Sequence, residues 1–217
     1  MPNSTNVAAN NSATRPYIIA WFIGLLFYFM EYAVRSSPSV MITELSKFFG
    51  TSAVGVSGIV GMYYYTYSVT SLAAGIALDR VGAKYTVAAG VAILGLGCIM
   101  FAVSSLFTGD AGRLLQGAGS AFAFPGCVYL ATQGFSSRSL ATAIGFTQCL
   151  GMLGGTAGQF VVAPLIQGGL PLSTFWIAVG LICLVLCVAQ FFVTPADHHA
   201  KTQGPTCLLY TSDAADE

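Results

Sequence analysis

The stretch Gly75-Ile-Ala-Leu-Asp79-Arg80-Val-Gly82-Ala-Lys84 decides the fold, because it places charges between two long apolar runs. A charged side chain at the centre of a bilayer costs roughly 3 kcal/mol or more. A short charged segment between two runs of membrane length is therefore expected at a membrane surface. Gly82 permits a tight turn there, and Arg80 and Lys84 favour its placement on the cytoplasmic side.

The composition indicates a protein whose solvent is lipid. Hydrophobic residues make up 55% of the 217 residues and charged residues make up 7%. Soluble domains carry about 25% charged residues, and so few charges could not cover a soluble core of this size. The formal net charge is zero, which gives no indication of nucleic-acid binding.

Six apolar runs approach the roughly 20 residues that a helix needs to cross the hydrocarbon core. The connections between these runs are short and polar. Residues 1–16 precede the first run and are expected to form a disordered cytoplasmic lead-in, because they are rich in Asn, Ser and Thr. We expect an all-α membrane protein with transmembrane helices at about 17–41, 53–78, 85–107, 111–133, 141–166 and 172–194.

The orientation follows from the basic residues in the connections, because cytoplasmic loops carry an excess of Lys and Arg. An N-terminus in the cytoplasm, at the plasma (inner) membrane, puts five basic residues inside and two outside. The inside residues are Arg15, Arg80, Lys84, Arg138 and Lys201, and the outside residues are Lys47 and Arg113.

The last residues, 207–217, differ in character from everything before them. Their sequence, Cys207-Leu-Leu-Tyr-Thr-Ser-Asp-Ala-Ala-Asp-Glu217, resembles the in-frame translation of a transposase-type sequencing adapter. Such a scar would carry no information about the native fold. On this interpretation, residues 195–206 begin a central cytoplasmic loop and the native protein continues beyond them. A natural acidic terminus is the alternative.

Three features together resemble the major facilitator superfamily of secondary transporters. The charged stretch described above is similar to that family's loop between helices 2 and 3. The segment Arg113-Leu-Leu-Gln116-Gly117-Ala-Gly119 is similar to the motif that opens its helix 4. The third feature is the order of the six helices around these motifs. The resemblance covers about residues 17–195, and it implies two inverted three-helix units that form one half of a twelve-helix transporter.

The resemblance also implies roles for the loop residues. Asp79 is expected to pair with an arginine and to face a helix of the missing C-terminal half, which latches the cytoplasmic side shut. Gly75 is expected to let its helix approach a neighbour closely. Arg80 and Lys84 are expected to fix the topology or simply to anchor the loop inside. Ala83 stands where the family often has a basic residue.

Glu31 and Arg35 lie in the first run at i and i+4, so they share one helix face and can pair. Charges within a membrane span suggest a functional site that faces a cavity. Glu31 is a candidate for binding a coupling proton if burial favours its neutral form, and Arg35 is a candidate for binding a carboxylate or phosphate. The alternative is that the helix ends early and the pair lies at the outer interface.

Four tyrosines, Tyr63, Tyr64, Tyr65 and Tyr67, lie in the middle of the second run. Successive helical residues point about 100° apart, so the four cannot all face one pocket. Tyr64 and Tyr67 share a face and are candidates for lining a cavity. Packing alone is the alternative.

In the fourth run, the resemblance implies that Arg113 helps to form a central cavity or a proton relay, and Gln116 belongs to the same motif. The alternative places Arg113 at the membrane interface. Pro125 is expected to kink this helix.

The fifth run carries two overlapping G-x-x-x-G spacings, which are typical of close helix packing in membranes. The glycines are Gly151, Gly154, Gly155 and Gly158. The antiporter subgroup of the family has a Gly-Pro pair in this helix, whereas the proline here is Pro164, after Ala163. This difference speaks against drug:proton antiport.

The sequence contains no nucleotide-binding loop, zinc-ligand spacing or nucleophile elbow. We therefore expect a protein that is not an enzyme and that needs no cofactor or metal beyond a coupling ion, the proton.

The expected function is secondary active transport, by alternating access, of a small polar solute with an anionic group, such as a sugar phosphate, an organic acid or a small peptide. The expected partners are the lipid bilayer, this solute and the missing C-terminal half. The alternatives are a drug or metabolite:proton efflux carrier and a non-transporting six-helix sensor or assembly partner.

Overall fold

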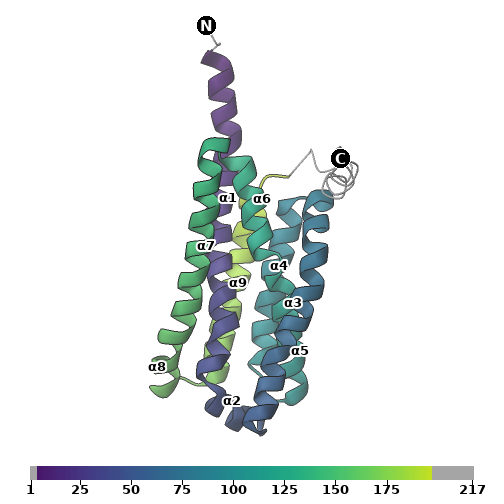
Figure 1. The fold of residues 1–217 in the computed structure, drawn as a ribbon, viewed down its shortest axis with the longest axis vertical. Coiled ribbons are helices and arrows are strands. Elements are labelled where there is room, and N and C mark those ends of the chain that lie inside the picture. The colour runs from purple at the N-terminus through teal and green to yellow at the C-terminus, as the bar shows by residue number, and fades with distance from the viewer. Residues whose placement is uncertain (1–3, 197–217) are drawn as a thin grey trace, which may run out of the picture.

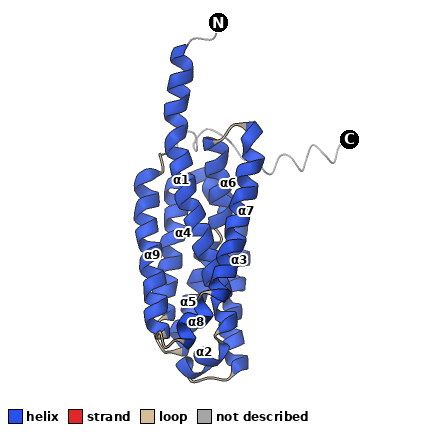
Figure 2. Ribbon diagram, turned by 90° about the vertical axis from the view of Figure 1, so that its left-hand side faces the viewer, coloured by secondary structure: helices blue, strands red, loops and turns tan. Residues whose placement is uncertain are grey.

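The computed structural model describes residues 4–196, which form a bundle of helices with no strand among them (Figure 1, Figure 2). The expected adapter-like tail at 207–217 lies outside the described residues, as does most of the segment 195–206. The elements are α1 (Ser4–Ser36), the 3₁₀ turn η1 (Ser37–Val40), α2 (Ile42–Phe49), α3 (Ala53–Val81), α4 (Ala83–Phe101), α5 (Leu106–Ser120), α6 (Ala123–Gly134), α7 (Ser137–Phe160), α8 (Val162–Gln167) and α9 (Leu172–Val193).

Within residues 4–196, five helical stretches are long and apolar enough to cross a membrane, and α2 with α3 makes a sixth that is bent by 100°. This confirms the predicted all-α, multi-pass membrane fold. The five stretches are Thr14–Val40, Ala83–Phe101, Leu106–Gly134, Ser137–Gln167 and Leu172–Val193.

Helix α1 begins at Ser4, so residues 4–16 are helical and do not form the disordered lead-in that their polar composition suggests. The segment contains three alanines, which have the highest helix propensity. It also extends a membrane-spanning helix, so it adds turns without the cost of a new nucleus. In Figure 1 this part of α1 projects beyond the rest of the bundle.

Helix α2 was expected to be part of a polar connection, and it is instead a short amphipathic helix. It buries Leu45 and Phe49, and the ring of Phe49 lies 5.2 Å from that of Phe101 in α4. Gly50 ends the helix with φ of 63°, a conformation that favours glycine. Apolar residues three to four positions apart therefore define a helix that closes one end of the bundle.

Two predicted spans are broken, and each break lies one turn before a proline. A proline ring clashes with the carbonyl of the residue four positions earlier. Helix α5 gives way to α6 around Ala121, four residues before Pro125, where a kink was expected. Helix α7 ends at Phe160, four residues before Pro164, and α8 follows.

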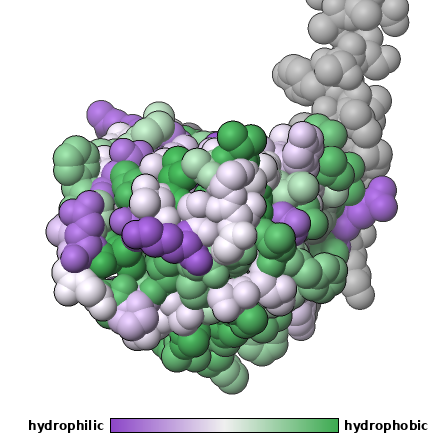
Figure 3. Space-filling view, turned by 90° about the horizontal axis from the view of Figure 1, so that it is seen from below, coloured by the Kyte–Doolittle hydropathy of each residue, from purple (hydrophilic) through white to green (hydrophobic). Residues whose placement is uncertain are grey.

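Helix α1 lies at the centre and packs against α6, α7 and α9, while α3 packs mainly against α5 and α4 mainly against α5 and α9. Helices α3 and α7 carry large exposed apolar side chains, among them Val69 and Leu72 on α3 and Leu153 and Phe160 on α7. Figure 3 shows the end that carries α2 and α8, where hydrophilic side chains form small groups among apolar ones.

Three of the four predicted packing glycines lie against α1. A Cβ atom at Gly151, Gly154 or Gly158 would collide with atoms of α1. At Gly155 a Cβ atom would touch only the ring of Tyr32, which shares its cleft with Gly155. The contact between α1 and α7 is therefore one seam of glycines, at i, i+3 and i+7.

We predict that Gly154→Ala destabilises the bundle, because its Cβ atom would meet the backbone of Phe29, which cannot move aside. Overpacking of this kind costs about 1–3 kcal/mol. The matched control is Gly145→Ala in the same helix, where a Cβ atom meets nothing within 4 Å. The control should be neutral or stabilising by up to about 1 kcal/mol, because alanine favours the helix. Thermal unfolding of both variants in detergent checks this. Equal unfolding temperatures would contradict the claim that Gly154 is needed for the close contact between α1 and α7.

Candidate functional site

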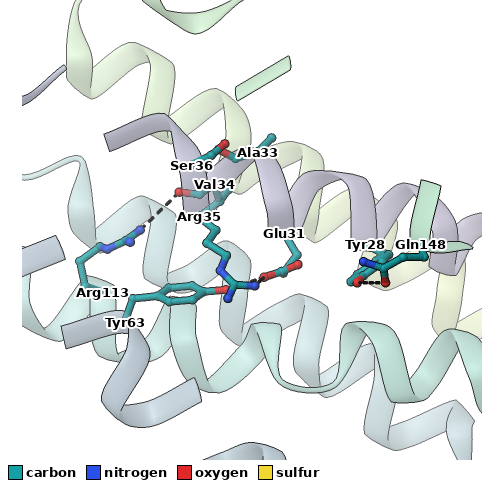
Figure 4. Close-up of polar contacts among 9 residues, drawn as sticks. All are labelled: Tyr28, Glu31, Ala33, Val34, Arg35, Ser36, Tyr63, Arg113 and Gln148. Atoms are coloured by element: carbon teal, nitrogen blue, oxygen red, sulfur yellow. Dashed lines mark hydrogen bonds and ion pairs between the residues drawn. The ribbon is translucent and has the colours of Figure 1, made fainter. Parts of the chain in front are cut away.

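Three charged side chains meet in the interior of the described bundle: Glu31, Arg35 and Arg113. Glu31 is 1% exposed and Arg113 is fully buried, whereas Arg35 is 26% exposed. Nη1 of Arg35 lies 3.8 Å from Oε1 of Glu31, so the predicted i, i+4 pair forms, with a long ionic contact. Figure 4 shows Arg35 directed toward Glu31 on the same helix, α1, and Arg113 of α5 directed toward the carbonyl of Val34.

Tyr63 of α3 lies between the two guanidinium groups. Its hydroxyl donates a hydrogen bond of 2.6 Å to Oε1 of Glu31. Its ring centroid is 4.8 Å from Cζ of Arg113 and 5.9 Å from Cζ of Arg35. Tyr63 therefore joins the carboxylate to both cations (Figure 4).

Arg113 is held by neutral acceptors from three helices. Its Nη1 donates to Oε1 of Gln116 at 2.7 Å and to the carbonyl of Val34 at 3.4 Å. Its Nη2 donates to the carbonyl of Val60 at 3.5 Å. Since Glu31 is the one carboxylate beside Arg35 and Arg113 in the described part of the chain, the cluster holds two positive charges and one negative charge.

Aromatic rings surround Arg35. The ring centroids of Tyr32, Tyr64 and Tyr67 lie 5.3, 5.4 and 5.1 Å from its Cζ atom. Such contacts stabilise a cation by about 0.5–2 kcal/mol each, depending on solvation. Tyr64 and Tyr67, the tyrosines that the sequence indicates as candidates for lining a cavity, thus lie beside Arg35. Tyr63, which donates the hydrogen bond to Glu31, is not among those candidates.

A cleft of about 450 Å³ opens beside Arg35, between α3 and α7. Its wall combines the guanidinium with hydroxyl, amide and apolar groups. The lining residues are Tyr32, Arg35, Ser36 and Ser39 from α1 and η1, Val60 and Tyr64 from α3, and Met152, Gly155, Thr156, Gln159 and Phe160 from α7.

Arg113 and Gln116 do not line this cleft, although both were candidates for binding substrate or coupling protons. Both side chains are fully buried within the described bundle. Arg113 reaches the wall of the cleft through the carbonyl of Val60, which accepts a hydrogen bond from its Nη2, and it lies against the ring of Tyr63. Arg113 thus lies as a positive charge behind the wall of the cleft, and Gln116 accepts a hydrogen bond from it.

The charged loop is a tight connection between α3 and α4. Gly82 has φ of 85° and lies between the two helices. Asp79 and Arg80 are exposed in the last turn of α3, and within residues 4–196 Asp79 forms no ion pair. Nζ of Lys84 lies 5.0 Å from the ring centroid of Phe191 in α9.

The expectation that Gly75 lets α3 approach a neighbour is wrong for the contacts within the described bundle. A Cβ atom at Gly75 would meet nothing within 4 Å. The residue lies on an exposed face of α3, so its small size is not required by any neighbour among residues 4–196.

The fold and the cluster together define a multi-pass membrane protein with a buried cation, Arg113, and a partly exposed one, Arg35, beside a cleft between α3 and α7. The model of the Major Facilitator Superfamily matches residues 21–209, and the chain belongs to this family. The chain is also 27% identical, over 172 residues, to the Methylenomycin A resistance protein of Bacillus subtilis (strain 168). That match covers 77% of this chain and 36% of the relative, so the chain spans about a third of the relative's length.

Proposed function

We propose that this chain is the amino-terminal half of a secondary transporter that carries a small polar organic anion by alternating access. The observation that carries the proposal is the excess of positive charge beside the cleft. A buried cation is costly unless an anion or several dipoles compensate it. Arg35 has Glu31 as its one carboxylate among the described residues, at 3.8 Å, and Arg113 is bonded to neutral acceptors, so an anion entering the cleft beside Arg35 is favoured.

The size and lining of the cleft support a small organic solute. A cleft of about 450 Å³ lies in the usual range for sites of small molecules, roughly 300–1,000 Å³. We infer that the solute is a sugar phosphate, an organic acid or a small peptide. An ion gradient drives its transport, with the proton as coupling ion and Glu31 as its binding residue.

The exposed faces of α3 and α7 support the presence of a second half. They flank the cleft, and they carry apolar side chains that no described residue covers. Reading the source DNA past codon 206 tests this part of the proposal. We expect the reading frame to continue into six further apolar helices, whereas a stop directly after codon 217 would contradict it.

We also propose that the N-terminus is cytoplasmic and that the protein lies in the plasma membrane. The excess of basic residues at one end of the bundle supports this orientation. The turn with Arg80 and Lys84 and the turn with Arg138 lie at the end from which α1 projects, whereas Lys47 lies in α2 at the other end (Figure 1).

The role of Asp79 is also a proposal. Asp79 is exposed and has no ionic partner within the described residues, so we infer a partner in the second half. We predict that Asp79→Asn lowers turnover of the full-length gene product by about 10-fold or more, because a charge-assisted hydrogen bond contributes roughly 1.5–3 kcal/mol. Membrane insertion should be unchanged, as should transport by the control Glu44→Gln at the opposite end. Wild-type transport by Asp79→Asn would refute the proposal that Asp79 pairs with the second half to close the cytoplasmic side.

Drug efflux is the second candidate function. Two observations favour it: the relative named above is a resistance protein, and Val60, Met152 and Phe160 give the cleft apolar walls. The position of Pro164, outside a Gly-Pro pair, speaks against the antiporter subgroup.

Ligand-induced stabilisation of the purified full-length gene product separates the two candidates. The probes are glucose 6-phosphate, succinate and dialanine for the first function, and the lipophilic cation tetraphenylphosphonium for the second. We expect the unfolding temperature to rise with at least one of the first three probes, since ligands that bind the native state stabilise it. A rise with tetraphenylphosphonium alone would favour efflux and contradict the anion proposal.

A further inference from the structure

The Tyr63 hydroxyl and the Arg35 guanidinium both lie near the same oxygen of the Glu31 carboxylate. Oε1 accepts the hydrogen bond from Tyr63 at 2.6 Å, and the same atom is 3.8 Å from Nη1 of Arg35. A direct charge-assisted N–H···O contact measures about 2.7–2.9 Å, so Arg35 stands about 1 Å farther away than such a bond requires. The other oxygen, Oε2, is buried and has no hydrogen-bond partner among the described residues.

Several contacts fix the position of Tyr63. Its side chain is fully buried, and its ring stacks on that of Tyr67, with centroids 5.9 Å apart and planes inclined by 13°. Its backbone packs directly on Gly117 of α5, where a Cβ atom would collide with the Tyr63 carbonyl. One turn further on, the hydroxyl of Thr66 donates to the carbonyl of Leu114 at 2.7 Å. The tyrosine hydroxyl is therefore held in place by the packing of α3 on α5.

Arg35, in contrast, remains accessible. It is 26% exposed and lines the cleft, and its other close neighbours, Tyr64 and Tyr67, are uncharged, so no second carboxylate among the described residues pairs with it. We propose that Tyr63 is a positioning residue, whose hydroxyl holds the Glu31 carboxylate and thereby keeps the Arg35 guanidinium free to bind an anion. This inference deepens the proposed function and rests on it for the role of Arg35 as the anion-binding group.

Removing the hydroxyl should reverse this arrangement. Tyr63→Phe keeps the ring between the two arginines and removes only the hydrogen bond to Glu31. A buried carboxylate without a donor is unfavourable. The nearest remaining donor is Arg35, one turn away on the same helix, so the carboxylate and the guanidinium should close into a direct pair.

The reactivity of Arg35 toward phenylglyoxal, which modifies free guanidinium groups, measures this closure. The full chain is reconstituted in lipid nanodiscs, and modification of each arginine is followed by peptide mass spectrometry. We expect Tyr63→Phe to slow modification of Arg35 by at least about fivefold, the equivalent of one hydrogen bond. The matched control is Tyr65→Phe on the same helix, whose side chain is 71% exposed, and it should react like the wild type.

A double-mutant cycle shows whether the effect passes through Glu31. In a Glu31→Gln background, Tyr63→Phe should have no effect on the modification of Arg35. Glu31→Gln alone should change the rate by less than about twofold, because the carboxylate does not hold Arg35 tightly. This single variant also tests the proposal if Tyr63→Phe misfolds, which thermal unfolding would reveal.

Four results would overturn the inference: an unreactive Arg35 in the wild type, an unchanged or faster rate in Tyr63→Phe, a slow rate that persists with Glu31→Gln, or a large increase in Glu31→Gln alone. The measurement involves no transport. Its failure would therefore refute the role of Tyr63 and leave anion transport to be judged by uptake.

Discussion

Arg35→Ala will reduce uptake of the anionic solute by at least about 100-fold in the full-length gene product, because two hydrogen bonds to a charged group contribute about 1.5–3 kcal/mol each and each 1.4 kcal/mol is a factor of ten. Arg35 is the cation that reaches the cleft, and its planar fork can bind a carboxylate or phosphate through two parallel hydrogen bonds. Its removal leaves Glu31 without an ionic partner. The charges of Glu31 and Arg113 then balance, and the attraction for an anion is lost.

Two controls make this result specific. Arg35→Lys keeps the charge but loses the fork, so it should retain part of the uptake. Lys47→Ala removes an exposed cation at the same end of the bundle and should transport normally. Thermal unfolding should show that all three variants are folded. Normal uptake by Arg35→Ala would place the anion elsewhere.

The second large effect separates stability from function. We predict that the double replacement Arg113→Met/Gln116→Leu leaves the bundle at least as stable as the wild type and abolishes uptake. Both side chains are fully buried, and they bond to each other at 2.7 Å. Replacing a buried polar pair by apolar side chains of similar volume is often neutral or stabilising by about 1–4 kcal/mol, whereas removing one partner leaves the other unsatisfied.

Uptake should nevertheless disappear, because Arg113 supplies the second positive charge behind Tyr63. Without it the cluster is neutral, with Glu31 balancing Arg35, and the attraction for an anion is lost. Unfolding temperature and uptake are measured on the same preparation, with the single variant Arg113→Met as the destabilised comparison. Wild-type uptake in the double variant would show that Arg113 has a structural role only.

The sequence was sufficient to predict the parts of this site that depend on helical spacing. Glu31 and Arg35 pair because they are four residues apart, and Arg113 and Gln116 bond because they are three apart. The choice among the tyrosines could not be made in the same way. Rotation of about 100° per residue excludes a common face for all four but does not say which one faces Glu31. The packing of α3 on α5 decides in favour of Tyr63.

Two other features of the structure that differ from the expected helices have a signal in the local sequence. The spacing of Leu45 and Phe49 indicates the amphipathic helix α2, and the carbonyl four residues before Pro125 and Pro164 marks each helix break. For Gly75 there was no such local signal. A Cβ atom there would meet nothing within 4 Å among the described residues, and no local sequence pattern tells whether a helix packs against this position.

Uptake by proteoliposomes tests the central claim most directly. The purified full-length gene product is reconstituted, a proton gradient is imposed, and accumulation of labelled glucose 6-phosphate, succinate and dialanine is followed beside tetraphenylphosphonium. We predict that at least one of the first three solutes accumulates, that collapse of the proton gradient stops its accumulation, and that Arg35→Ala does not accumulate it. Transport of tetraphenylphosphonium with none of the other three would contradict the account.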